Sequence, residues 1–146
     1  MLRGNHPAKI DEKGRLKIPT SFRNLIEQQY GKDLFITSIS GEFVRIYPMP
    51  IWLEIEKKIA AVSSMNPTIQ RFLNRVNYYG SVGTLDAQGR VVIQPLLRRS
   101  ADVTGDVAVL GHQRYLDVWN HDRIKTKLEA EPVSEEDQNV LASFEI

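Results

Sequence analysis

A short motif that occurs twice most constrains what this chain can fold into. Asp11-Glu12-Lys13-Gly14-Arg15 returns 75 residues later as Asp86-Ala87-Gln88-Gly89-Arg90, and each copy stands between apolar neighbours. The residues that follow also match, Leu16-Lys17-Ile18-Pro19 against Val91-Val92-Ile93-Gln94-Pro95. We therefore interpret the chain as two versions of one small β-rich unit, each presenting a sharp turn.

The chemistry of the turn accounts for Asp and Gly but not for Arg. An Asp at the first position accepts a hydrogen bond from the backbone two residues on, and a Gly at the fourth takes a positive φ without strain. The Arg after the Gly lies on the opposite limb of the hairpin, close enough to pair with the Asp. A guanidinium oriented in this way suits phosphates and guanine edges. The alternative is a structural salt bridge that closes the mouth of the hairpin.

Alternating apolar residues and turn signals predict the same series of elements in each copy. It consists of two short strands, a helix opened by a proline, two further strands and a second helix. For the first copy we expect strands at 8–10 and 15–18, a helix from Pro19 to Gly31, strands at 33–37 and 43–47, and a helix from Pro48 to about Val62. For the second we expect a short helix from Pro95, strands at 106–110 and 115–119, and a helix from Asn120 to about Glu129.

Two segments lie outside the repeat. Asn66-Pro67 breaks the preceding helix, and the apolar spacing after it predicts another helix over 68–79. After Pro132 the sequence is compatible with a capped amphipathic helix or with a loose acidic tail.

The composition excludes several classes of protein. The 146 residues fit one compact domain or two very small ones. The chain has no Cys, which excludes thiol catalysis, thiolate metal sites and disulfides. No apolar run approaches the ~20 residues of a membrane span, and the N-terminus lacks the apolar core of a signal peptide. The residues His6, His112 and His121 show no metal-ligand spacing, so we expect neither metal nor cofactor.

The charge is unevenly distributed although the net charge is only +1. Residues 1–75 carry twelve Lys and Arg against seven Asp and Glu, whereas residues 76–146 carry seven against eleven. From Glu129 to the end there are six acidic residues and no basic one. This asymmetry indicates an anionic partner for the N-terminal end, and a solvated surface with charge scattered by chance is the alternative.

Several further motifs carry a resemblance to a known family. They are Ile18-Pro19, Tyr47-Pro48 with Trp52, Ser63-Ser64-Met65-Asn66-Pro67, and Trp119 near the end of the second copy. Together with Asp11…Arg15 and Asp86…Arg90, these residues make the chain resemble the MraZ family, whose members carry two AbrB/SpoVT-like units. The start, Met1-Leu2-Arg3-Gly4, departs from the usual Met-Phe-x-Gly.

The resemblance implies a mostly β fold with helices (α+β). Two tandem AbrB-like swapped-hairpin units would form one pseudo-dimeric β-barrel with the helices packed outside. The implied segments are unit 1 at 5–50, a helical connector at 51–80, unit 2 at 81–124, and a C-terminal helix with an acidic tail at 125–146.

The resemblance also implies a function. The family consists of non-enzymatic, sequence-specific DNA-binding regulators, typically repressors, of the bacterial division and cell-wall gene cluster. They bind direct repeats in promoter DNA as ring-like homo-oligomers, which implies a cytoplasmic, nucleoid-associated protein with no membrane partner and no small-molecule substrate. The expected DNA contacts are Arg15, Lys13, Arg3, Lys9, Lys17 and Arg90. The expected turn-forming or Arg-orienting residues are Asp11, Gly14, Asp86 and Gly89. Because Gln88 replaces Lys13 in the second turn, we expect Arg15 to matter more than Arg90.

Three alternatives remain open. The first is a structural or partner-binding oligomer with incidental DNA affinity. The second is a hydrolase that uses Asp11 and Asp86, but an Arg in each turn would keep both pKa values too low for general acid catalysis. The third is an antitoxin-type AbrB regulator, which usually has one unit and a disordered toxin-binding tail, whereas this chain has two units.

Overall fold

The computed structural model describes all 146 residues, which form eight strands and six helices. In chain order the elements are β1 (Leu2–Ile10), β2 (Arg15–Lys17), α1 (Thr20–Tyr30), β3 (Asp33–Thr37), β4 (Val44–Pro48), α2 (Met49–Ala60), α3 (Pro67–Tyr78), β5 (Ser81–Thr84), β6 (Arg90–Val92), α4 (Pro95–Ala101), β7 (Gly105–Gln113), β8 (Tyr115–Asn120), α5 (His121–Ala130) and α6 (Glu135–Ser143).

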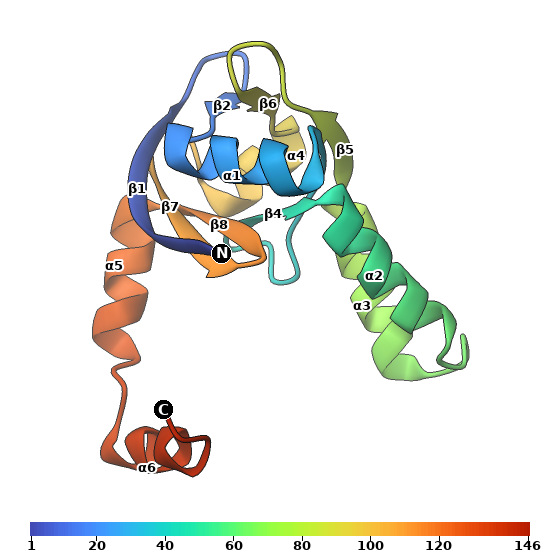
Figure 1. Cartoon of the computed structure of the whole chain (residues 1–146), viewed down its shortest axis with the longest axis vertical. Coiled ribbons are helices and arrows are strands. Elements are labelled where there is room, and N and C mark those ends of the chain that lie inside the picture. Colours follow the sequence, from blue (N-terminus) through green and yellow to red (C-terminus); the bar gives the residue numbers. More distant parts are fainter.

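The strands form one antiparallel sheet in the order β5-β3-β4-β8-β7-β1-β2-β6, which curls into a nearly closed barrel (Figure 1). The two outermost strands, β5 and β6, are the limbs of one hairpin. Its turn is closed by the hydrogen bond from the backbone N–H of Asp86 to the carbonyl of Arg90 at 3.0 Å. The expected α+β barrel is confirmed.

The two units exchange hairpins. Strand β1 of the first unit pairs along its whole length with β7 of the second, from Leu2↔Gln113 to Ile10↔Gly105. Strand β5 of the second unit pairs in turn with β3 of the first. Strands β2 and β6 are neighbours, and so are β4 and β8. When β5 and β6 are counted as neighbours around the barrel, interchanging the units leaves the cyclic strand order unchanged. The barrel therefore has a pseudo-twofold axis, and neither unit completes it alone.

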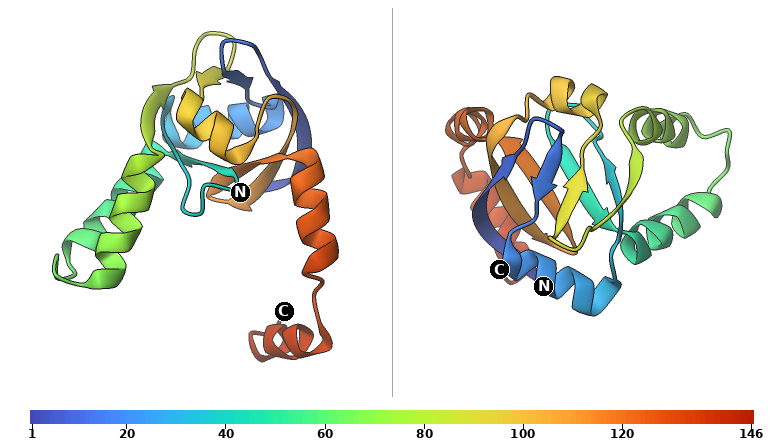
Figure 2. Two further views of the ribbon diagram at one scale, coloured as in Figure 1. Left: turned by 180° about the vertical axis from the view of Figure 1, so that it is seen from behind. Right: turned by 90° about the horizontal axis from the view of Figure 1, so that it is seen from above.

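Helices α1 and α4 lie on opposite sides of the barrel (Figure 2). Each contributes buried side chains to the main core, Phe22 and Ile26 from α1 and Leu97 and Ala101 from α4. The interior-facing strand residues, such as Leu16 and Val91, complete a cluster of 20 buried residues. A cluster of five buried residues around Trp52 joins α2 and α3 to the barrel.

The helix pairs α2–α3 and α5–α6 extend from the side of the barrel opposite the β1–β2 and β5–β6 turns (Figure 1). Asn120 caps α5 as expected, since its side chain accepts a hydrogen bond from the N–H of Arg123 at 3.0 Å. The chain after Pro132 forms the capped helix and not a loose tail, because Ser134 and Asp137 form a reciprocal capping box. No helix is both long and apolar enough to span a membrane.

The largest difference from the expected elements is in β1, which begins at Leu2 and not at residue 8. Gly4 and Pro7 weaken the local strand signal. Pro7 is tolerated because β1 pairs with β2 only at Ile10, which leaves its other edge open over most of its length. Long-range pairing with β7 therefore decides the conformation of this segment.

Candidate nucleic-acid interface

The first turn is built by both oxygens of one carboxylate. Oδ1 of Asp11 accepts hydrogen bonds from the backbone N–H groups of Lys13 at 3.0 Å and Arg15 at 2.9 Å. Oδ2 accepts a hydrogen bond from Nε of Arg15 at 2.6 Å. Gly14 has φ +80°, and its N–H donates to the carbonyl of Asp11 at 2.9 Å. Asp11 therefore fixes the turn and the guanidinium together.

The second turn repeats this arrangement. Oδ1 of Asp86 accepts from the N–H groups of Gln88 at 2.8 Å and Arg90 at 2.9 Å, and Oδ2 accepts from Nε of Arg90 at 2.9 Å. Gly89 has φ +74°. In both turns, Asp accepts the backbone hydrogen bonds and Gly adopts the positive φ.

The electrostatics keep both carboxylates ionised. The backbone hydrogen bond from Arg15 is the largest cause that lowers the pKa of Asp11, and the side-chain hydrogen bond and charge of Arg15 add to it. The backbone hydrogen bond of Arg90 lowers the pKa of Asp86 in the same way. Carboxylates held in the ionised form are unsuited to general acid catalysis at neutral pH.

Of the three guanidinium nitrogens of its Arg, each Asp engages only Nε. Nη1 and Nη2 of Arg15 make no hydrogen bond within the chain, and the same holds for Arg90. Both side chains are partly exposed, with 32% of Arg15 and 28% of Arg90 accessible. Each turn therefore presents the two free Nη groups of a fixed guanidinium, the fork that matches a guanine edge or a phosphate.

The pairing of β2 with β6 joins the two turns into one surface. Leu16 and Val91 pair with each other and face the core, so the residues on either side of them face outward. The register places Arg15 opposite Val92 and Lys17 opposite Arg90. The result is a two-stranded ribbon whose outer face carries three cations and one apolar side chain, a shape that can enter a major groove.

The other expected contacts are not all near this ribbon. Lys13 is exposed at the tip of the first turn. Lys9 lies two residues before the start of that turn, and its Nζ is 3.9 Å from Oδ1 of the exposed Asp106. Arg3 pairs with His112 near the opposite end of β1 from the turn. The structure thus brings together Lys9, Lys13, Arg15, Lys17 and Arg90, and leaves Arg3 apart.

Two arginines missed in the sequence brace the turns from the helix of the opposite unit. Arg23 of α1 lies against Gly89, where an added Cβ would be 2.5 Å from its Cδ, and it donates to the carbonyl of Ala87 at 3.0 Å. Arg98 of α4 lies against Gly14, where an added Cβ would be 2.6 Å from its Cζ. Because Arg23 and Arg98 are also 75 residues apart, extending the repeat alignment through the helix would have found them.

The two bracing arginines differ in their partners. Arg23 forms an ion pair with Glu27 at 3.1 Å. Arg98 forms no ion pair, and its buried Nε has no hydrogen-bond partner. The first turn is therefore supported by a cation that the chain does not neutralise, which adds positive potential beside Lys13 and Arg15.

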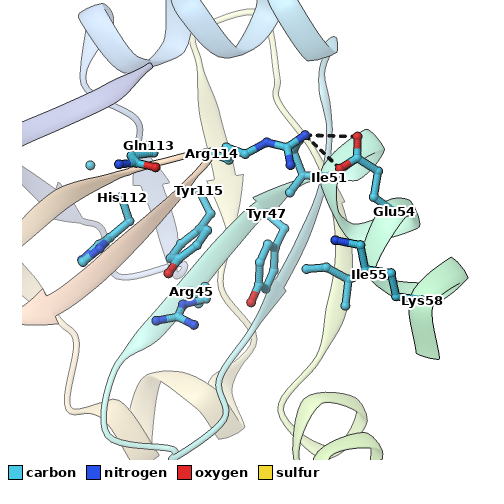
Figure 3. A pocket seen from close by; sticks show the side chains of 11 residues that line it. Arg45, Tyr47, Ile51, Glu54, Ile55, Lys58, His112, Gln113, Arg114 and Tyr115 are labelled. Atoms are coloured by element: carbon cyan, nitrogen blue, oxygen red, sulfur yellow. Dashed lines mark hydrogen bonds and ion pairs between the residues drawn. The ribbon is translucent and has the colours of Figure 1, made fainter. Parts of the chain in front are cut away.

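A separate cavity of about 590 Å³ lies between α2 and the β7–β8 turn (Figure 3). Its two arginines are paired with carboxylates. Arg114 forms an ion pair with Glu54 at 2.8 Å, and Arg45 forms two hydrogen bonds with the buried Asp117, at 2.9 and 3.2 Å. Both arginines of the cavity are thus paired within the chain, whereas the Nη groups of Arg15 and Arg90 at the turns are free.

A nearly closed barrel of two exchanged hairpin units, with an Asp-oriented Arg after the turn of each, defines a class of α+β swapped-hairpin proteins. The comparisons with known proteins specify the family. The family model described as "MraZ protein, putative antitoxin-like" matches residues 1–75. The chain belongs to the MraZ family of transcriptional regulators.

Relatives match over almost the whole length. The chain is 51% identical over 144 residues to "Transcriptional regulator MraZ" of Acidobacterium capsulatum, which covers 99% of each chain. It is 46% identical over 147 residues to the protein of the same name of Koribacter versatilis, covering 100% of each. It is 32% identical over 139 residues to that of Escherichia coli O9:H4, covering 92% of this chain and 91% of the relative.

Proposed function

We propose that this regulator binds double-stranded promoter DNA through the β2–β6 ribbon, with Arg15 as the principal contact. The observation that carries the proposal is the geometry of Arg15. Asp11 holds its Nε at 2.6 Å and leaves both Nη groups free on the outer face. An oriented guanidinium loses little side-chain entropy when it makes a bidentate bond to a guanine.

The two turns contribute unequally in this proposal. Lys13 and Lys17 of the first unit correspond to Gln88 and Val92 of the second. The first turn therefore offers more phosphate contacts, with Lys9 beside it and Arg98 beneath it. Arg90 is a secondary contact. Arg3 is the weakest of the proposed contacts because it lies at the far end of β1.

Assembly completes the proposed function. One ribbon contacts few phosphates, so a single chain binds weakly. A ring-like homo-oligomer that presents several ribbons to several direct repeats gains ~10²–10⁴-fold in affinity when the spacing fits.

In the cell this protein would act at the nucleoid in the cytoplasm, on the promoter of the division and cell-wall gene cluster and typically as a repressor. Residues 5–50 and 81–124 would read DNA, and the segments 51–80 and 125–146 would serve assembly.

Substitution of Arg15 tests the proposal. The Arg15→Ala protein should bind a fragment of its own upstream region roughly tenfold or more weakly in a gel shift, because a bidentate guanine contact is worth about 1–3 kcal/mol. Arg90→Ala is the matched control and should lose less. Light scattering should show the same assembly mass for all three proteins.

Two results would contradict the proposal. The first is an Arg15→Ala protein that binds as tightly as the unchanged chain. The second is equal affinity of the unchanged chain for intact and scrambled repeats, which would favour the alternative of a structural or partner-binding oligomer with incidental DNA affinity.

A further inference from the structure

Helix α6 is fully formed but packs on nothing in its own chain. It has nine residues, none of them buried, and a capping box at its N-terminus. Isolated helices shorter than ~12–15 residues are marginal in water. A capped helix of this length therefore needs a surface to pack on, and its own barrel does not supply one.

The surface of α6 combines acidic and apolar side chains. Glu135 and Glu136 lie in its first turn and form no ion pair within the chain. At its other end Phe144 and Ile146 are 67% and 82% exposed. A complementary surface should therefore place cations at one end and an apolar side chain at the other.

The outer face of α3 combines cations at one end with an aromatic side chain at the other. Arg71, Arg75 and Tyr78 follow the spacing i, i+4, i+7 and so share one side of the helix. With Asn74 and Tyr79 they line a hollow of about 450 Å³. Neither arginine forms an ion pair within the chain, and Tyr78 is 62% exposed. We define these three residues as the α3 face.

The dimensions of the two surfaces agree. At 1.5 Å per residue, Arg71 and Tyr78 are ~10 Å apart along α3, and Glu136 and Phe144 are ~12 Å apart along the C-terminal segment. A parallel arrangement brings Glu136 to the arginines and Phe144 to Tyr78, because residues eight apart lie on the same broad face of a helix. In one chain, however, α3 and α6 extend from opposite sides of the barrel in both views (Figure 1, Figure 2).

We propose that α6 of one copy docks on the α3 face of a second copy. This inference deepens the proposed function and rests on the self-association within it. Donor and acceptor are different surfaces, so the contact is heterologous and repeats from copy to copy until it closes. Both surfaces lie on the side of the barrel opposite the turns, which leaves the ribbon free for DNA.

Disulfide trapping tests the contact directly, because the natural chain has no Cys. Full-length Tyr78→Cys and Phe144→Cys proteins are mixed without DNA under mild oxidation and compared on a non-reducing gel. A heterodimeric disulfide should form in the mixture at least tenfold faster than between Tyr78→Cys and a Leu53→Cys control on the exposed face of α2. Equal rates would overturn the proposal. A monomeric disulfide as the main product of the double Tyr78→Cys/Phe144→Cys protein would also overturn it, because α6 would then dock in its own chain.

Charge reversal provides a second measurement. Arg71→Glu with Arg75→Glu should raise the dissociation constant of assembly roughly tenfold, and adding Glu136→Lys should restore part of the loss. Lys57→Glu with Lys58→Glu on α2 is the matched control and should have little effect. An unchanged assembly in the Arg71/Arg75 variant would overturn the proposal. These readouts need no DNA, so failure of the Arg15 proposal leaves them interpretable.

Discussion

Asp11 and Asp86 each perform two tasks with two oxygens. One oxygen closes the turn through backbone N–H groups, and the other fixes a guanidinium. The side chains around this shared frame differ between the units. Lys13 and Lys17 in the first correspond to the neutral Gln88 and Val92 in the second. At the scale of single residues, both turns keep the Asp, Gly and Arg, but only the first unit keeps the two lysines.

This difference predicts the salt dependence of DNA binding. Lys13→Gln and Lys17→Val give the first unit the side chains of the second. Each should flatten the slope of log K against log salt by about 0.9 if that Lys neutralises one phosphate. Affinities measured by fluorescence anisotropy at several salt concentrations would give the slopes. Lys57→Gln on α2 is the control, and a slope that stays the same in both test variants would exclude these lysines from the interface.

At the scale of elements, local signals predicted the hairpin turns, the helices that begin at prolines and the capped ends, because each depends on residues close in sequence. The first half of β1 and the exchange of hairpins were not predictable from periodicity. They depend on pairing between residues about 100 positions apart, such as Leu2 with Gln113. The exchange was expected only through the resemblance to a family. The bracing arginines were missed because their partners are the turns of the other unit.

Because Arg98 contacts Gly14, we expect a substitution at Gly14 to affect DNA binding as well as the stability of the fold, and a substitution at Gly31 to affect stability alone. Gly14→Ala and Gly31→Ala both place Ala at a positive φ, +80° and +92°. Gly14→Ala should lower the free energy of unfolding by about 1–2 kcal/mol. Gly31→Ala should lower it by about 1–3 kcal/mol, because φ +92° with ψ −160° is a conformation that essentially only Gly adopts. Only at Gly14 does the new Cβ displace Arg98, since nothing lies within 4 Å of a Cβ at Gly31. Gly14→Ala should therefore also weaken DNA binding, whereas Gly31→Ala should not. Urea unfolding and gel shifts measure the two effects, and equal binding by both variants would contradict a role for Arg98.

At the scale of the whole molecule, the charges of the two units are complementary to each other, whereas two copies of one unit would not be complementary. Strands β4 and β8 cross the pseudo-twofold axis with Arg45 opposite Asp117, two residues at equivalent positions of the repeat. Burial alone lowers the pKa of Arg45, but the hydrogen bonds and charge of Asp117 outweigh it and keep that pKa above its usual value. Two identical units would place like charges at this position.

Separated units should therefore fail to fold. Residues 1–80 lack the β7 partner of β1, and pairing of two such fragments would bring two Arg45 side chains together at a largely buried position. We expect each of the fragments 1–80 and 81–146 to lack a cooperative thermal transition by circular dichroism, and their equimolar mixture to regain one. A cooperative transition of fragment 1–80 alone would show that folding needs neither the β1–β7 pairing nor the Arg45–Asp117 pair.

The inequality of the two turns gives the ribbon a direction. A symmetric dimer of identical units reads the same bases from both sides, and its sites are palindromes. Here the Lys-bearing turn defines a front and the Gln-bearing turn a back, so each subunit can recognise an oriented sequence with no internal symmetry. In the proposed assembly, copies joined head to tail and facing the same way would match a promoter whose sites all point in one direction.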